Sequence, residues 1–233
     1  MLNGGEIAKL YEDLSQSVSI DGIYNVALNA TIGQNVEFAA YGCLSGEISL
    51  PDMSPAVKLN YPDEWIEEYF ADELFGVDPV VTRIMNVGKA TQWARLATTS
   101  SEKQFMERSQ SAGLHDGLAV PLLGPNGTQF VFSFSSGETI SHDTLRSCNM
   151  VAHLAHATML DLLHLPEFDS DNLLDQHRYV LSGLANGKTR DVVADEMGIT
   201  TDGVAYHLKE IRRRLKTHNI VHSVAKAIRK NLV

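Results

Sequence analysis

GLANGKTRDVVADEMGITTDGVAYHLKEIRRRL, residues 183–215, carries the strongest structural signal in the chain. Thr189 suits the start of a short helix and Gly198 its end, and a threonine at 200 or 201 then caps a second helix. Two short helices joined by a three-residue turn that contains a glycine predict a helix-turn-helix. The second helix carries Lys209 and the arginine run 212–214, which suits a DNA major groove and its phosphates.

The helical pattern continues on both sides of this stretch. LLDQHRYVLSGLANG is expected to be helical up to Gly187, and Ser223 is expected to begin the last helix, VAKAIRKNL. Apolar residues at helical spacing form a predicted core. Its members are Val180, Leu181, Leu184, Val192, Val193, Ala194, Met197, Ile199, Val204, Leu208, Ile211 and Leu215. We therefore predict an all-α domain over residues 173–233.

Strand signals lie upstream of this domain. VEFAAYGCL (36–44) is followed by a Ser-Gly turn and predicts a strand, and a second strand is expected to lead to Tyr61. GLAVPLL and TQFVFSFSS flank GPNG (124–127) and predict a β-hairpin. These runs together predict an antiparallel sheet.

Helix signals surround the strands. Apolar residues recur at helical spacing near the start of the chain, at Ile7, Leu10, Tyr11, Leu14, Ile23, Val26, Ala27 and Ala30. Helices are also predicted from Pro62, from Pro79 with Asp78 as its cap, and from Ser100 or Ser101 to Gly113. A long helix is expected from Ser141 to about Leu165, ended by Pro166.

This order of elements fits an α/β/α sandwich around an antiparallel sheet, so the whole chain is predicted to be α+β. LPEFDSDN (165–172) has one proline, three acids and no periodicity, which is typical of a linker. We therefore expect an N-terminal domain over 1–165, a linker over 166–172 and the helix-turn-helix domain over 173–233.

Charge is divided unevenly between these parts. The chain has a formal net charge of −10, yet residues 173–233 carry +5 and residues 1–172 carry −15. Such asymmetry indicates an acidic body with a module for a polyanion. A chance run of solvated helix surface is the alternative.

Composition excludes several classes of protein. Hydrophobic residues make up 44% and charged residues 21%, which allows a packed core and argues against wholesale disorder. No apolar run is long enough to span a membrane, and the start lacks the pattern of an export signal. Two cysteines, Cys43 and Cys148, give no disulfide framework. We expect a cytoplasmic protein with no membrane partner.

The two parts resemble the two domains of LuxR-type quorum-sensing transcription factors. Residues 183–215 match the helix-turn-helix pattern of that family, from Gly-Lys-Thr (187–189) to the final Arg-Leu. NYPDEWIEEYF (60–70), VDPVV (77–81), Trp93 and GLHDGLAVPLLGPNG (113–127) resemble its acyl-homoserine-lactone-binding domain. The resemblance implies a bacterial transcription regulator that binds this ligand and promoter DNA.

The resemblance also implies a ligand site. Trp65 would donate to the lactone carbonyl, Asp78 would accept the amide N–H, and Tyr61, helped by Ser133, would donate to the acyl carbonyl. Tyr69 and Trp93 would wall the pocket. The chemistry is consistent, because such a ligand needs one acceptor, two or three donors and an apolar cleft. Taken singly, a Trp or Tyr on a helix is more often plain core, and Asp78 before Pro79 is more often a helix cap than a ligand acceptor.

On the DNA side, the resemblance implies a homodimer on double-stranded DNA, with RNA polymerase as a further partner and no cofactor. The residues expected to contact DNA are Lys188, Thr201, Asp202, Ala205, Tyr206, Lys209, Arg212 and Arg213. The long helix 141–165 and VAKAIRKNL are candidate dimer surfaces. One departure stands out: His177 replaces a glutamate that is close to invariant in the family.

Three rival interpretations have less support. His153, His156, Asp161 and His164 could suggest a metal enzyme, but the H-x-x-x-H spacing of zinc sites is absent, and a structural or dimer-interface role is favoured. Ser133 and Cys43 lie outside any nucleophile elbow. A phosphorylation-controlled regulator would begin with an alternating strand–helix receiver domain, which the first sixty residues do not suggest.

A ligand-independent regulator also remains open. The sequence does not determine acyl length, 3-position oxidation or an aryl tail, nor whether ligand promotes or releases DNA binding, nor the target sequence, activation or repression, or a cognate synthase.

Overall fold

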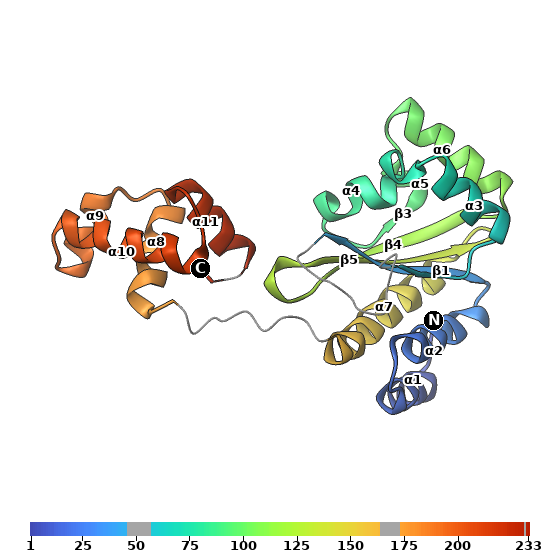
Figure 1. Cartoon of the computed structure of the whole chain (residues 1–233). Helices are drawn as coiled ribbons and strands as arrows, with labels where there is room; N and C mark the ends of the chain where they lie inside the picture. The colour runs from blue at the N-terminus through green and yellow to red at the C-terminus, as the bar shows by residue number, and fades with distance from the viewer. Residues whose placement is uncertain (46–56, 164–172, 231) are drawn as a thin grey trace. The chain divides into compact units, whose positions relative to one another are not determined.

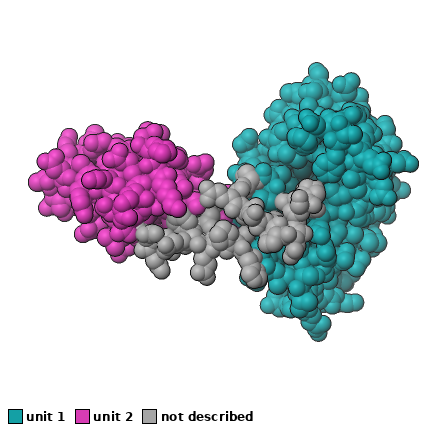
Figure 2. All heavy atoms as spheres, viewed as in Figure 1, with its two compact units in different colours: residues 1–124, 128–165 teal, residues 125–127, 166–233 magenta. Residues whose placement is uncertain are grey.

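The structure is a computed structural model that describes residues 1–45, 57–163, 173–230 and 232–233. The chain divides into two compact units, residues 1–124 with 128–165, and residues 166–233 with 125–127 (Figure 2). The expected linker, 166–172, lies outside the described residues. That this segment separates the two domains stays a prediction.

The first unit is built on a five-stranded antiparallel sheet with the order β2-β1-β5-β4-β3. Its strands are β1 (Phe38–Ser45), β2 (Val57–Leu59), β3 (Thr91–Gln92), β4 (Asp116–Leu123) and β5 (Gln129–Ser136). The expected hairpin is β4–β5, joined by a 3-10 turn at Pro125–Gly127. The short edge strand β3 was not expected from the sequence.

Helices cover both faces of this sheet, which confirms the α/β/α sandwich (Figure 1). One face carries α1 (Gly4–Gln16), α2 (Ile20–Ile32) and α7 (His142–Leu162). The other carries α3 (Asp63–Ala71), α4 (Pro79–Val87), α5 (Trp93–Leu96) and α6 (Ser100–Ser111). A 3-10 turn, Leu74–Gly76, precedes α4.

The two faces have separate apolar clusters because side chains alternate along each strand. On β5, Phe130, Phe132 and Phe134 are buried under α2 and α7, whereas Val131 belongs to the cluster under α3–α6. Ser133 points to the same side as Val131 and is also buried. One strand thus supplies an aromatic core to one face and smaller side chains to the other.

Three details of this unit differ from the sequence-based expectations. Tyr11 is 66% exposed, because Leu10 and Leu14 already form the buried stripe of α1. The cap of α6 is Thr99, since its hydroxyl accepts the Glu102 N–H while the Glu102 carboxylate accepts the Thr99 N–H. The long helix α7 ends at Leu162 rather than Leu165, because Leu163 already has an extended backbone.

The second unit is all helical, as expected, with a core of its own. Its helices are α8 (Asp175–Ala185), α9 (Arg190–Met197), α10 (Thr201–Leu215) and α11 (Ile220–Arg229). Gly198 ends α9 in the left-handed region, at φ 65°, and Thr200 caps α10 by accepting the Gly203 N–H. The pair α9–α10 is therefore the expected helix-turn-helix.

Two expectations for this unit were wrong. Val192 is 43% exposed, because Val193 and Ala194 occupy the buried side of α9. The last helix begins at Ile220 with Asn219 as its cap, and Ser223 lies inside it, bonded to the Thr217 hydroxyl. Across the described parts of both units, no helix has the length and apolar character needed to cross a membrane.

Candidate ligand and DNA sites

A cavity of about 280 Å³ lies in the first unit, between the sheet and helices α3–α6. The structure brings to its wall all six residues that the sequence singled out for ligand contact: Tyr61, Trp65, Tyr69, Asp78, Trp93 and Ser133. Most of the remaining wall is apolar and includes Leu44, Phe105, Leu114 and Val131. The cavity thus combines an apolar surface with a few polar groups, as small-molecule sites do.

Asp78 is the acidic group of the cavity wall. As the cap of α4, its Oδ1 accepts the Val80 N–H at 2.7 Å, and its Oδ2 accepts the Tyr69 hydroxyl at 2.9 Å. Burial raises the pKa of Asp78 from 3.8 to about 6, although both hydrogen bonds oppose the rise. The carboxylate is therefore ionised at neutral pH, in a largely apolar surrounding.

Ser133 on β5 joins two aromatic residues of the wall. Its hydroxyl accepts the Trp93 indole N–H at 3.0 Å and hydrogen-bonds with Tyr61. Burial raises the pKa of the Tyr61 phenol well above its usual value, and the bond with Ser133 opposes that rise. Tyr61 is thus a neutral hydroxyl at physiological pH, able to donate a hydrogen bond.

Trp93 depends on a glycine beneath it. A Cβ at Gly117 would lie 2.4 Å from the Trp93 indole and 2.8 Å from the Phe134 carbonyl oxygen. The indole therefore packs directly on the backbone of β4, and only glycine leaves space for it.

Trp65, the second tryptophan of the cavity wall, lies in an aromatic cluster. It is 3% exposed, and its ring packs against Tyr69 and Phe105 at centroid distances of 6.1 and 5.8 Å. Trp65 lines the cavity together with Trp93, whose indole N–H is donated to Ser133. An indole N–H is a hydrogen-bond donor on a large apolar ring, so at the wall of this cavity it suits a ligand acceptor.

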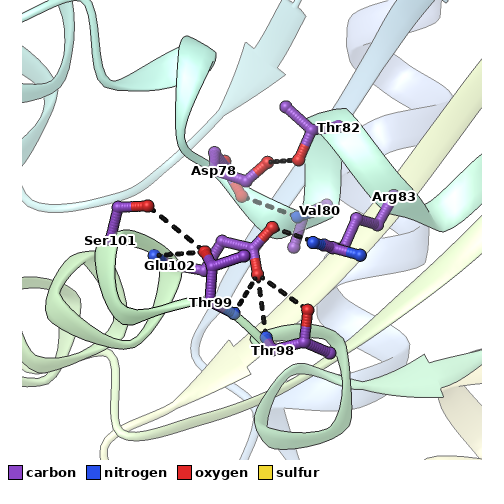
Figure 3. Close-up of polar contacts among 8 residues, drawn as sticks. All are labelled: Asp78, Val80, Thr82, Arg83, Thr98, Thr99, Ser101 and Glu102. Carbon is purple, nitrogen blue, oxygen red and sulfur yellow. Dashed lines mark hydrogen bonds and ion pairs between the residues drawn. The ribbon is translucent and has the colours of Figure 1, made fainter.

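Two features of the wall were missed by the sequence reasoning. Tyr69 was expected only as an apolar wall, yet its hydroxyl bonds Asp78. Behind the wall, the Glu102 carboxylate of α6 accepts bonds from Arg83 of α4 and from the Thr98 and Thr99 backbone (Figure 3). These partners hold the pKa of Glu102 down at about 2. The pattern Thr99-x-x-Glu102 is a capping-box signal that could have revealed part of this network.

Two histidines of α7 contact backbone carbonyl oxygens, and one of them also contacts a tyrosine hydroxyl. His156 is buried, with Nδ1 at 2.9 Å from the Tyr41 hydroxyl and Nε2 at 3.2 Å from the Leu123 carbonyl oxygen. His153 is exposed and contacts the Asn149 carbonyl oxygen. His164 lies outside the described residues, and the described ones include no group of three side chains able to hold a metal ion.

In the second unit, α10 is amphipathic. Val204, Leu208, Ile211 and Leu215 are buried, whereas Thr201, Asp202, Ala205, Tyr206, Lys209 and Arg213 are exposed and Arg212 is half-buried. Lys188 lies between α8 and α9, where its ammonium pairs with Glu196 at 2.7 Å. Arg213 pairs with Glu210 at 2.9 Å. Exposed pairs of this kind are weak enough to exchange for phosphate contacts.

Comparison with known proteins covers both units. Residues 21–159 match the autoinducer binding domain, and residues 171–227 match bacterial regulatory proteins of the luxR family. Transcriptional activator protein PhzR from Pseudomonas fluorescens is 27% identical over 230 residues, which cover 95% of this chain and 93% of PhzR.

Solved structures show the same fold. Escherichia coli SdiA aligns over 98% of this chain and 97% of its own, with a TM-score of 0.66 and 18% identity. A structure of SdiA in complex with octanoyl-rac-glycerol gives a TM-score of 0.64 at 18% identity, over 99% and 97% of the two chains. CepR2 from Burkholderia cenocepacia, described as N-acylhomoserine lactone dependent, gives 0.56 at 17% identity, over 68% and 96%.

This family consists of transcriptional regulators rather than enzymes. An autoinducer-binding fold with a lined cavity precedes a helix-turn-helix with a basic recognition helix. The chain belongs to the LuxR family of bacterial regulatory proteins and is a ligand-responsive, DNA-binding transcription regulator of the quorum-sensing type.

Proposed function

We propose that the ligand of the first unit is an N-acyl-homoserine lactone. The observation that carries this proposal is the pairing, in one apolar cavity, of a single buried carboxylate with separate hydrogen-bond donors. The ligand has one amide N–H, carbonyl acceptors at both ends of the amide–lactone group, and an apolar tail. Each polar group of the cavity then has one complementary group on the ligand.

In this arrangement Asp78 accepts the amide N–H. Trp65 donates its indole N–H to the lactone carbonyl, and Tyr61, held by Ser133, donates to the acyl carbonyl. Tyr69 fixes the Asp78 carboxylate, and Trp93 forms a wall. The description of CepR2 as N-acylhomoserine lactone dependent supports this ligand class, and the octanoyl chain bound to SdiA supports a site for a medium-length acyl tail.

A thermal melt with a panel of lactones tests the ligand proposal. At about 100 times its dissociation constant, a cognate ligand adds about 2.7 kcal/mol to the free energy of unfolding. Octanoyl-rac-glycerol serves as a comparison ligand, because it has the acyl chain but no amide N–H for Asp78. Stabilisation by this glycerol ester and by no lactone, or by neither, would contradict the proposal.

We also propose that the second unit binds promoter DNA as part of a homodimer and meets RNA polymerase there. Helices α7 and α11 are the proposed dimer surfaces. Lys209 and the exposed residues near the start of α10 face the base edges, and Lys188, Arg212 and Arg213 contact phosphates. Two recognition helices would then read half-sites about one helical turn apart.

The salt dependence of DNA binding tests this assignment. Arg213→Ala should weaken all sequences alike and lower the salt slope by about one unit, whereas Lys209→Ala should also relax the choice of sequence. Lys103→Ala, on α6 of the first unit, is the matched control and should bind as the parent does. Equal effects of Arg213→Ala and Lys103→Ala would contradict the proposed interface.

A further inference from the structure

His177 occupies an unusual position at the start of α8. Its ring is 2% exposed, and its Nδ1 accepts the backbone N–H of Leu174, the helix cap, at 3.2 Å. The bond satisfies one of the free N–H groups at the helix start. Since Nδ1 accepts a hydrogen bond, it carries no proton, and the imidazole is neutral.

The same ring meets the recognition helix. The rings of His177 and His207 of α10 lie 5.5 Å apart between centroids, in an edge-to-face arrangement of 69°. The Nδ1 atom of His207 is itself buried with no partner in the described structure. The contact between α8 and α10 therefore includes, beside the apolar core, two imidazoles that tolerate little added charge.

The charges around His177 also oppose its protonation. Burial is the first cause that lowers the pKa of His177; Arg214 and His207 of α10 lower it further, and Glu210 of α10 opposes them. Asp175 and Arg178 are the charged neighbours on α8. Charged groups of the other packed helices include Glu196 on α9, paired with Lys188, and Lys226 and Arg229 on α11.

We propose that His177 is a positioning residue, which holds the recognition helix in its DNA-binding orientation only while its imidazole is neutral, so that mild acid weakens DNA binding reversibly. A protonated ring would turn a second N–H toward the Leu174 N–H and would add a positive charge beside Arg214. The inference rests on DNA binding by this unit and is independent of the ligand's identity.

The direction of the pH effect follows from linkage. The pKa of His177 in the folded chain lies below the ordinary 6.5, so the unfolded state binds more protons between the two values. The contribution to stability is complete above pH 6.5 and is lost as the pH falls through that range. General protonation has the opposite effect on DNA binding, because it adds positive charge to the protein.

The test uses the full-length protein at about pH 7.5 and about pH 5.5, on either side of the ordinary histidine pKa. Hydrogen exchange of α10, corrected for the intrinsic pH dependence of exchange, reports how firmly the recognition helix is held in the unit. Exchange of α7 reports the first unit as an internal reference. Binding to a short random-sequence duplex at low salt is measured in parallel.

We expect α10 of the parent to lose protection at the lower pH while α7 keeps it, with a several-fold weaker binding to the duplex. His177→Gln keeps an acceptor that does not titrate in this range. This variant should retain both the protection of α10 and the affinity for the duplex at the lower pH. His177→Asn provides a second such acceptor if the glutamine variant folds poorly. His218→Gln, at an exposed position of the same unit, should behave as the parent.

Unchanged α10 protection in the parent would overturn the inference. An equal loss of protection in the parent and in whichever of the two His177 variants folds would overturn it as well. Tighter binding of the parent at the lower pH would show that added positive charge dominates, which also contradicts it.

Discussion

The two faces of the sheet in the first unit differ in packing: one is closely packed, and the other contains a cavity. Under α2 and α7, the aromatic rings of β5 stack closely, with Phe132 and Phe134 at a centroid distance of 4.6 Å. The buried polar pair on this face, Tyr41 and His156, is bonded within the core. Under α3–α6, neighbouring residues of the same strand line a cavity of about 280 Å³.

The difference shows which side chains serve stability and which serve the ligand. On the packed face, the buried Tyr41–His156 pair is hydrogen-bonded and the apolar groups are closely packed, so much of the free energy of folding is gained there. On the cavity face, the buried Asp78 carboxylate is kept at a cost in stability, because burial disfavours its ionised form. A ligand that donates a hydrogen bond to this carboxylate would offset that cost.

The largest expected effect is on the packed face. Phe132→Ala should lower the free energy of unfolding of the first unit by about 3–5 kcal/mol, because it leaves a cavity among close-packed rings. The measurement is chemical denaturation without ligand. Its neighbour Ser133→Ala, on the other face, is the matched comparison: it should lower the free energy of unfolding by less, about 1–3 kcal/mol for the Trp93 N–H left without an acceptor, while weakening lactone binding. Equal destabilisation by the two variants would remove the distinction between the faces.

Replacing Asp78 should have the opposite pair of effects: a gain in stability and a loss of lactone affinity. The rise in its pKa from 3.8 to about 6 corresponds to roughly 3 kcal/mol against the ionised form, at about 1.4 kcal/mol per unit. Asp78→Asn keeps the helix cap and removes the buried charge, so the ligand-free protein should become more stable, by about 1–2 kcal/mol. Lactone affinity should fall by about 1.5–3 kcal/mol, because a charged acceptor is lost.

Calorimetric titration and thermal melts of this variant give both numbers. A variant that binds the lactone as the parent does would show that Asp78 is only a helix cap. A ligand-free variant less stable than the parent would show that the buried charge of Asp78 does not lower the free energy of unfolding of the parent.

Gly117 links the sheet to the cavity wall. Gly117→Ala should displace the Trp93 indole and break its bond to Ser133, at a cost of about 1–3 kcal/mol in stability, with weaker lactone binding. Gly137→Ala is the control, because a Cβ there meets only an ordinary contact at 3.6 Å. Tryptophan fluorescence and denaturation compare the two, and similar results for both would contradict the close packing of Trp93 on β4.

The smallest expected effect is that of pH on ligand affinity. Asp78 accepts the amide N–H as a carboxylate, so affinity should be nearly constant above about pH 7, should begin to fall as the pH nears the Asp78 pKa of about 6, and should fall by up to about tenfold per pH unit below it. Asp78→Asn should remove this dependence. A lactone affinity that stays constant down to about pH 5 would indicate that the ligand does not rely on the ionised form.

Much of this architecture could be predicted from local patterns. Turn glycines, caps and apolar spacing predicted the hairpin, most of the helices and the helix-turn-helix, because each depends on neighbours in the sequence. The errors occurred where several local choices compete. Thr99 and Ser100 are both acceptable caps, and Val192 and Val193 are equally apolar, so only packing against α8 and α10 decides which is buried.

The cavity wall shows the same limit. Its six expected residues came from a family resemblance, which carries positions but not hydrogen bonds. The bond of Tyr69 to Asp78 and the tie of Arg83 to Glu102 join residues 9 and 19 positions apart, through packing of separate helices. Such pairings follow from tertiary structure and leave little signal in one sequence.

Mass spectrometry of retained small molecules tests the central claim most directly. The parent and Asp78→Asn are each expressed alongside a panel of acyl-homoserine lactones and purified in the same way. We predict that one lactone, or a narrow range of chain lengths, is retained by the parent and lost from Asp78→Asn. Retention of none by the parent, or equal retention by both proteins, would contradict a lactone site in the cavity under α3–α6.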